Sequence, residues 1–133
     1  MRRIFIPLIA LAAVACGGSG GGGPTEAPLN ITSSGIASNT GSTAISIPVG
    51  GRVHYFNKDT VAHTIVASGT AGCATDLSSN GAIPPGGNDL RPVMSQTENC
   101  TLNDSSNAAL TASVSVVAAP AGGGGGGGGG SGY

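Results

Sequence analysis

The chain has 133 residues, of which 25 are glycine, and this length allows one small folded domain at most. Charged residues make up 8% of the chain and aromatic residues 3%, with no tryptophan. Without Arg2 and Arg3, which belong to a predicted leader, three basic residues (5 − 2) face six acidic ones, a net charge of about −3. No basic patch is present, so the composition argues against nucleic acid and against an anionic lipid surface as electrostatic partners.

Residues 1–15 have the pattern of a secretory signal peptide. Arg2 and Arg3 form a positive segment, and the apolar run Ile4–Val14 that follows is too short to span a bilayer as a helix. Small residues, which a signal peptidase reads, stand directly before Cys16. We therefore predict cleavage after residue 15 and export from the cytoplasm.

The segment Ala13–Gly17 resembles a bacterial lipobox, in which the cysteine after the cleavage site becomes the lipidated first residue of the mature protein. The resemblance implies a membrane anchor at Cys16, held by more than one acyl chain because a single chain binds only weakly. Gly17 is similar to an outer-membrane sorting signal, which implies a place in the bacterial cell envelope, at the outer membrane where the organism has one. The alternative is an ordinary cleavage site followed by a free Cys16.

Glycine-rich segments flank the middle of the chain. Residues 16–27 contain the first tract and are expected to form a flexible tether, because glycine offers no side chain to bury and the highest backbone entropy. Residues 120–133 contain an unbroken run of glycine and are expected to be a disordered tail, with a second linker as the alternative. The folded domain is then residues 28–119, enough for one small core.

Short alternating runs of apolar and polar residues occupy this domain, separated by glycine, proline and asparagine. The runs are Ala44–Val49, Arg52–Phe56, His63–Ala67 and Ala112–Val117, with a weaker run at Ile31–Ile36. No window keeps a helical period beyond one or two turns. The pattern predicts an all-β protein, an antiparallel Greek-key β-sandwich of about seven strands.

One part of this pattern resembles a known family. Val53–Val66 is similar to the cupredoxin segment in which a strand ends in Asn and Asp and a His, here His63, opens the next strand as a copper ligand. Further similar segments follow in the family's order: the Pro-Gly turn Ile83–Gly87, the Cys segment Thr97–Leu102 and the last strand Val114–Val117. The resemblance implies a cupredoxin-like fold over roughly residues 44–117, with His63 and Cys100 at ligand positions.

The copper ligands implied by this resemblance are incomplete. A type 1 copper site uses two imidazoles and one thiolate, usually with a weak axial Met. In the family the second His follows the Cys by about three residues and the Met comes a few residues later, but here Asn103 follows Cys100 and Met94 precedes it. We therefore predict a degenerate copper site, no cofactor, and a non-catalytic binding or structural module.

Two cysteines, Cys73 and Cys100, remain after lipidation of Cys16. An even pair in an exported protein indicates a disulfide, and a related group of exported cupredoxin-like proteins carries a similar cysteine at the position of Cys73. A disulfide would leave Cys100 without a thiolate for copper. The alternative is a copper-binding cupredoxin, active in electron transfer or copper handling through His63, Cys100 and a third ligand.

The remaining polar residues have ordinary interpretations. His63 could equally be a buried side chain bonded to a neighbouring carbonyl, and His54 is expected on the opposite, exposed face of its strand. Asp76, Asp89 and Asp104 are expected to be solvated loop carboxylates. The sequence has no nucleophile elbow, HExxH, P-loop or Cys-x-x-Cys motif, so we predict that the protein is not an enzyme. No protein partner can be named from the sequence.

Overall fold

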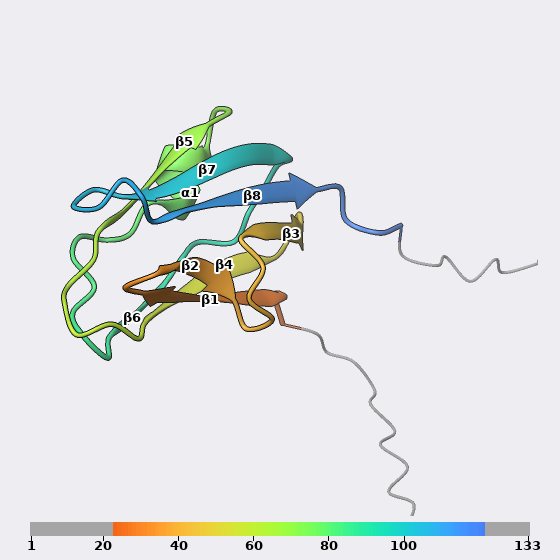
Figure 1. The fold of residues 1–133 in the computed structure, drawn as a ribbon. Helices are drawn as coiled ribbons and strands as arrows, with labels where there is room; N and C mark the ends of the chain where they lie inside the picture. The colour runs from red at the N-terminus through yellow and green to blue at the C-terminus, as the bar shows by residue number, and fades with distance from the viewer. Residues whose placement is uncertain (1–22, 122–133) are drawn as a thin grey trace, which may run out of the picture.

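A computed structural model describes residues 23–121, in which two β-sheets pack face to face (Figure 1). The predicted leader, Cys16 and most of the glycine-rich tail lie outside the described residues. The elements in chain order are β1 (Glu26–Thr32), β2 (Gly35–Ser38), β3 (Ala44–Pro48), β4 (Arg52–Asn57), β5 (Ile65–Gly69), α1 (Cys73–Leu77), β6 (Asn88–Leu90), β7 (Glu98–Asp104) and β8 (Thr111–Val117). The prediction of an all-β sandwich is confirmed.

Each sheet contains four strands, in the orders β2-β1-β4-β6 and β3-β8-β7-β5. Four of the six strand pairs are antiparallel, whereas β1 runs parallel to β4 and β3 runs parallel to β8. The chain moves to the other sheet between β2 and β3 and returns to the first sheet before β4. The strands of each parallel pair are therefore joined by a segment that passes through the other sheet, and not by a hairpin. The described sheets are therefore mixed, with eight strands, where the sequence predicted antiparallel pairing and about seven.

The weak run at Ile31–Ile36 is not one strand: it contains the end of β1, a two-residue turn and the start of β2. β1 ends at Thr32 and β2 begins at Gly35. The hydroxyl of Thr32 accepts a hydrogen bond from the N–H of Ser34 at 3.3 Å and donates to the carbonyl of Gly35 at 3.2 Å, which closes the turn. β1 itself begins at Glu26, two residues before the predicted domain boundary, because Glu26 is already paired with β4.

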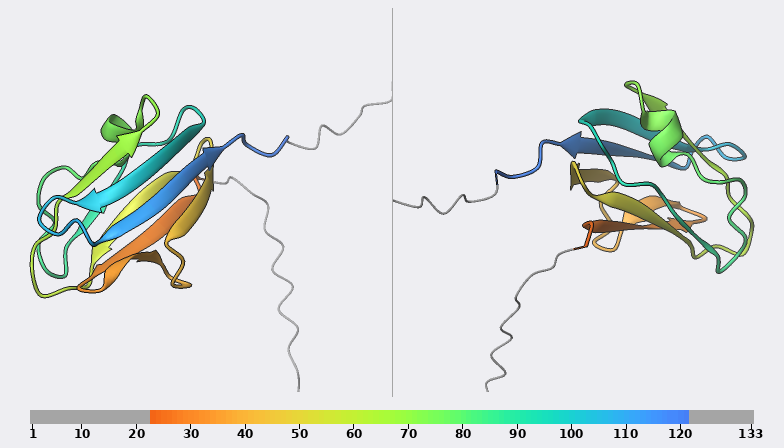
Figure 2. Two further views of the ribbon diagram at one scale, coloured as in Figure 1. Left: turned by 45° about the horizontal axis from the view of Figure 1, so that its top comes forward. Right: turned by 180° about the vertical axis from the view of Figure 1, so that it is seen from behind.

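The core lies between the two sheets, where alternate residues of most strands are buried, although β6 contributes no buried residue. It is mostly aliphatic, and its largest side chain is the fully buried Tyr55 on β4. The hydroxyl of Tyr55 donates to the carbonyl of Leu77 at 2.7 Å and so links the first sheet to α1. Cys73 and Leu77, four residues apart, form the buried face of this short helix, which lies against β5 at the outer edge of the second sheet (Figure 2).

The two ends of the sandwich carry different parts of the chain. The β4–β5 and β7–β8 connections lie at one end, and the start of β1 and the finish of β8 lie at the other (Figures 1 and 2). An open hollow of about 490 Å³ separates the described chain ends from the β3–β4 turn; it is lined by Gly23, Pro24, Thr25, Pro48, Val49, Gly50, Ala119 and Pro120. In residues 23–121 no helix has the length and apolar character needed to cross a membrane.

Candidate functional site

Strand β7 carries a buried carboxylate at each of its ends. Its buried, inward-facing residues are Glu98, Cys100, Leu102 and Asp104. The two carboxylates are six residues apart, about 20 Å along an extended strand. Each one belongs to a separate cluster of polar side chains.

The loop between β4 and β5 is held in place by Asn57, the last residue of β4. The side-chain amide of Asn57 donates to the carbonyls of Val61 at 2.7 Å and Ile83 at 2.8 Å, and its oxygen accepts from the N–H of Asp59 at 2.9 Å. His63 follows in this loop and exchanges two backbone hydrogen bonds with Ile83, at 3.1 and 2.7 Å. β5 begins two residues after His63, so this histidine precedes the strand that it was predicted to open.

His63 lies between two carboxylates, and we call Asp59, His63 and Asp104 the His63 cluster. Nδ1 of His63 is hydrogen-bonded to Oδ2 of Asp104, and Nε2 lies 3.0 Å from Oδ2 of Asp59. The side chains of His63 and Asp104 are 4% and 0% exposed. The other oxygen of Asp104 accepts from the N–H and the hydroxyl of Ser106, at 2.9 and 2.8 Å. Asp104 is therefore a buried, fully bonded carboxylate, not the solvated loop residue that the sequence predicted.

The surroundings of His63 favour its protonated form. Burial alone would lower the pKa of His63, but the hydrogen bonds and charges of Asp104 and Asp59 outweigh burial and raise this pKa above its usual value. Burial also acts to raise the pKa of Asp104, yet the bonds from His63 and Ser106 outweigh it and lower this pKa. The pKa of Asp59 is lowered by the N–H of Thr60 and by His63. An imidazolium donates from both nitrogens, which matches two carboxylate acceptors.

Asp104, which contacts His63, is the last residue of β7, and the β7–β8 loop follows it. Asn107 and Leu110 follow Asp104 along this loop at intervals of three residues. The side chain in contact with Nδ1 of His63 is thus the carboxylate of Asp104. Asn103, which the sequence placed at the position of the second imidazole, lies on β7, where it pairs with Val66 and Thr111.

Cys100 is not brought near His63. In the β5–β7 ladder Asp104 pairs with Ile65, but Cys100 pairs with Gly69. Four residues of strand correspond to about 13 Å, far beyond the span of two ligands on one ion. The pair of candidate ligands His63 and Cys100 is thus separated by the length of β5.

Two other residues considered from the sequence belong to neither cluster. Met94 is fully buried near the β3–β4 turn, where its backbone forms 2.8 Å hydrogen bonds with Gly50 and Gly51. His54 faces outward on β4, as predicted, and its ring lies against Phe56 with 4.1 Å between the ring centroids. Neither residue contributes to a ligand set with His63.

At the other end of β7, Cys73 and Cys100 form a disulfide, which confirms the predicted pairing. Cys73 comes from α1 and Cys100 from β7, with their Cα atoms 5.6 Å apart. The two residues are 1% and 4% exposed, so the bond is enclosed in the core. It closes a loop with a sequence separation of 27, for which the chain-entropy model gives about 3.5 kcal/mol of stabilisation.

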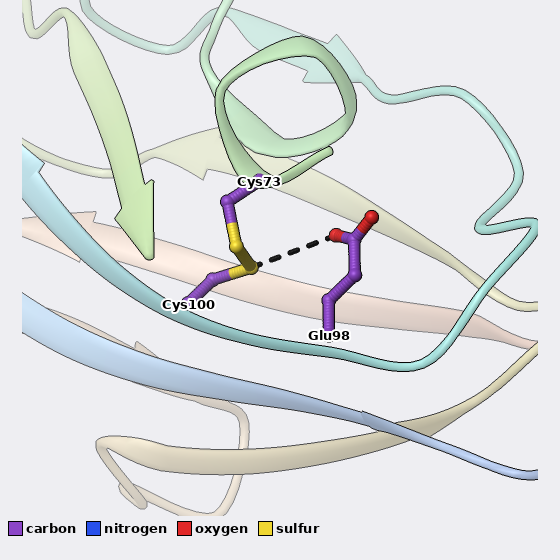
Figure 3. Close-up of side chains that lie close together, drawn as sticks. All are labelled: Cys73, Glu98 and Cys100. Atoms are coloured by element: carbon purple, nitrogen blue, oxygen red, sulfur yellow. Dashed lines mark hydrogen bonds between the residues drawn. A yellow bond between two sulfur atoms is a disulfide. The ribbon is translucent and has the colours of Figure 1, made fainter. Parts of the chain in front are cut away.

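Glu98 lies beside this bond, and we call Cys73, Glu98 and Cys100 the disulfide cluster (Figure 3). Glu98 is 1% exposed; its Oε1 accepts from Nε2 of Gln96 at 3.1 Å, and its Oε2 lies 3.6 Å from Sγ of Cys100. One ligand atom from each of the three residues falls within 4.8 Å of the others. Gly72, with φ at 109°, makes room for the carboxylate, because a Cβ there would collide with Glu98 Oε1.

Neither Glu98 nor Asp59 was predicted from the sequence to belong to a site. The available signal for Glu98 was the alternation along β7, which puts residues 98, 100, 102 and 104 on one face. The signal for Asp59 was its spacing of four residues from His63 in a loop that begins with Asn57. Neither signal could be interpreted without knowing the residues at which β4, β5 and β7 begin and end.

Comparison with known proteins identifies the fold. No family model and no curated protein matches the sequence. Among solved structures, a purple cupredoxin from Nitrosopumilus maritimus is 21% identical, with a TM-score of 0.53, over 68% of this chain and 98% of that one. An oxidised proline-to-glycine mutant of amicyanin is 13% identical, with a TM-score of 0.54, over 80% of this chain and 89% of that one. A reduced tryptophan-to-tyrosine mutant of amicyanin is 12% identical, with a TM-score of 0.55, over 71% of this chain and 82% of that one.

These likenesses and the two packed sheets define a β-sandwich of the cupredoxin class. The chain therefore has a cupredoxin-like fold, as the resemblance around Val53–Val66 implied.

Proposed function

We propose that the protein is an exported, lipid-anchored cupredoxin-like domain that has lost the type 1 copper site and acts as a non-catalytic binding or structural module. One observation carries this proposal: both ring nitrogens of His63 are hydrogen-bonded to carboxylates, from Asp59 and Asp104. The histidine that the family uses as a ligand is thereby engaged within the protein.

The chemistry of imidazole explains why this engagement opposes copper binding. A metal needs the lone pair of a neutral ring nitrogen, so metal binding competes with a proton. The raised pKa of His63, in which the bonds to Asp104 and Asp59 outweigh burial, strengthens the proton in that competition. His63 is thus held in an ion pair with Asp104 and Asp59, which occupies the ring nitrogens that copper would need as ligands.

The rest of the proposal depends on the N-terminus and on the absence of catalytic motifs from the sequence. The basic and apolar segments before Cys16 support export and lipid attachment, and hence a place in the bacterial cell envelope. The sequence holds no motif for nucleophilic, metal-dependent or phosphate chemistry, which supports a non-catalytic role. A protein or ligand partner would then be bound by the sandwich surface.

Titration of the full chain with Cu²⁺, followed by visible spectroscopy, tests this proposal. We expect no intense thiolate-to-copper absorption, and thiol labelling mapped by peptide mass should leave Cys100 unlabelled. His63→Gln is the matched control and should give the same featureless spectrum. An intense charge-transfer band that disappears in His63→Gln, with Cys100 labelled as a free thiol, would overturn the proposal.

A second candidate function is copper binding, in electron transfer or copper handling, through His63 and Cys100. It is favoured by the similar solved structures, which include a Cu(I) form of amicyanin at 10% identity. The separation of about 13 Å along β5 counts against a shared ion, because the ligands of one copper must lie within a few ångströms of each other. The same spectrum separates the two functions.

A further inference from the structure

The contact between Glu98 and Cys100 is unusual in its chemistry. Oε2 of Glu98 lies 3.6 Å from Sγ of Cys100 (Figure 3). A disulfide sulfur carries no proton, so this contact becomes a hydrogen bond only when Cys100 is a thiol. The oxidised protein thus holds one carboxylate oxygen of a 1% exposed residue against an atom that donates nothing to it.

The carboxyl group of Glu98 likewise has no cationic partner among the described residues. This carboxyl group accepts a hydrogen bond from the neutral side-chain amide of Gln96. Burying a carboxylate without a cation is costly, so such groups in proteins are paired or coordinate a metal. A cation at this position would complete the environment of Glu98.

We propose that the disulfide cluster is a redox-gated metal site: once a dithiol opens the Cys73–Cys100 bond, the two thiolates and Glu98 bind one Zn²⁺. Thiolates and carboxylates are both ordinary ligands of zinc, and three protein ligands leave the fourth tetrahedral position for water or another group. A divalent ion with two thiolates and one carboxylate leaves a net charge of −1 in the core. A monovalent copper ion would leave −2, so the buried position favours zinc.

The electrons and protons of this gate balance. The external dithiol is oxidised to its own disulfide and passes two electrons and two protons to Cys73 and Cys100, which become thiols. Binding of Zn²⁺ then breaks the two S–H bonds, forms two Zn–S bonds and releases two protons. The carboxylate oxygen of Glu98, already in hydrogen-bond geometry to Cys100, accepts the thiol proton on its way out.

In the disulfide-bonded protein the surroundings hold the three proposed ligands in place. Glu98 and Cys100 share the inward face of β7, and Cys73 is fixed by α1. The hydroxyl of Thr70 lies 3.7 Å from Sγ of Cys73 and can donate to a thiolate there. Gly72 provides the space that the Glu98 carboxylate fills. Entry of a metal requires the two sulfurs to move apart once the disulfide is open.

The test uses the full chain with Cys16→Ser, so that no third thiol contributes. The protein is reduced with a dithiol under nitrogen, freed of reductant, and titrated with Zn²⁺ by calorimetry and with Co²⁺ as a coloured substitute. We expect one ion per reduced chain, a thiolate-to-cobalt charge-transfer band, and no binding by the oxidised chain. Glu98→Gln should weaken binding by about tenfold or more, while the matched exposed change Glu26→Gln should leave it unchanged.

Each other outcome has a defined meaning. Equal affinities of Glu98→Gln and Glu26→Gln would overturn the assignment, because the cysteines alone would then account for the binding. Circular dichroism follows the fold: if the reduced chain unfolds, Zn²⁺ must restore the β-sheet signal. A reduced chain that binds no zinc, or that stays unfolded with zinc present, also overturns the proposal.

Discussion

The substitution Asp104→Asn removes one charge from the His63 cluster while keeping the volume of the side chain. Its effect should depend on pH, because the partner of Asp104 titrates. The pKa of His63 is raised in the folded protein by Asp104 and Asp59 against the effect of burial, so its stabilising contribution is complete below about pH 6.5 and is lost as pH rises through the folded pKa. The pKa of Asp104 is lowered, so its contribution is present above about pH 3.9 and lost as pH falls.

The magnitude follows from the burial of the pair. His63 and Asp104 are 4% and 0% exposed, and removing one partner of a buried charge pair costs about 3–5 kcal/mol. We therefore expect Asp104→Asn to lower the free energy of unfolding by about 3 kcal/mol at pH 5.5. Where His63 has become neutral, the substitution removes only a hydrogen bond to a charged acceptor, which contributes about 1.5–3 kcal/mol. The cost of Asp104→Asn at pH 9 should therefore lie at the lower end of that range.

Urea unfolding followed by circular dichroism at the two pH values measures both costs. Asp76→Asn, a partly exposed carboxylate on α1, serves as the matched control and should change the free energy of unfolding little at either pH. An equal cost of Asp104→Asn at pH 5.5 and pH 9 would refute the argument that His63 is the titrating partner. A cost below about 0.5 kcal/mol at pH 5.5 would refute the buried pair itself.

Three further outcomes are expected. The double change Cys73→Ala and Cys100→Ala should lower the melting temperature by about 15 °C or more, since loss of about 3.5 kcal/mol corresponds to 4–8 °C per kcal/mol in a domain of this size; scanning calorimetry would contradict this with a shift of a few degrees. Gly72→Ala should cost about 2 kcal/mol or more, because its φ is 109° and a Cβ would meet Glu98; unchanged urea unfolding would count against the packing described here. Intact mass spectrometry of the membrane fraction should find acyl groups on Cys16, and a soluble product with an unmodified Cys16 would disprove lipidation.

Much of the sandwich could be predicted because alternation along a strand is a local signal. Ala44–Val49 and Ala112–Val117 agree with β3 and β8 to within one residue, since one side of each strand packs on the core. The parallel pairing of β3 with β8 could not be predicted in this way. It depends on which sheet each strand joins, and no local pattern carries that information.

The candidate site shows a different limit. The disulfide could be predicted from chemistry alone, because an exported chain with two remaining cysteines tends to pair them. The contact of His63 with Asp104 could not be predicted in this way. Cys100 and Asp104 lie on the same face of β7, and a family pattern with a cysteine directs attention to Cys100. Only the strand register, which pairs Asp104 with Ile65, decides between them.

The two described ends of the chain leave the same end of the sandwich and line one open hollow, and this makes the domain suited to insertion. Two short connections would be enough to splice it into a loop of a host protein, and a short bridge between the ends would allow the chain to be opened elsewhere as a circular permutant. A domain inserted through these two chain ends is attached to its host at one end of the sandwich only. The β4–β5 connection, which contains the buried His63, and the β7–β8 connection lie at the opposite end and are then presented outward.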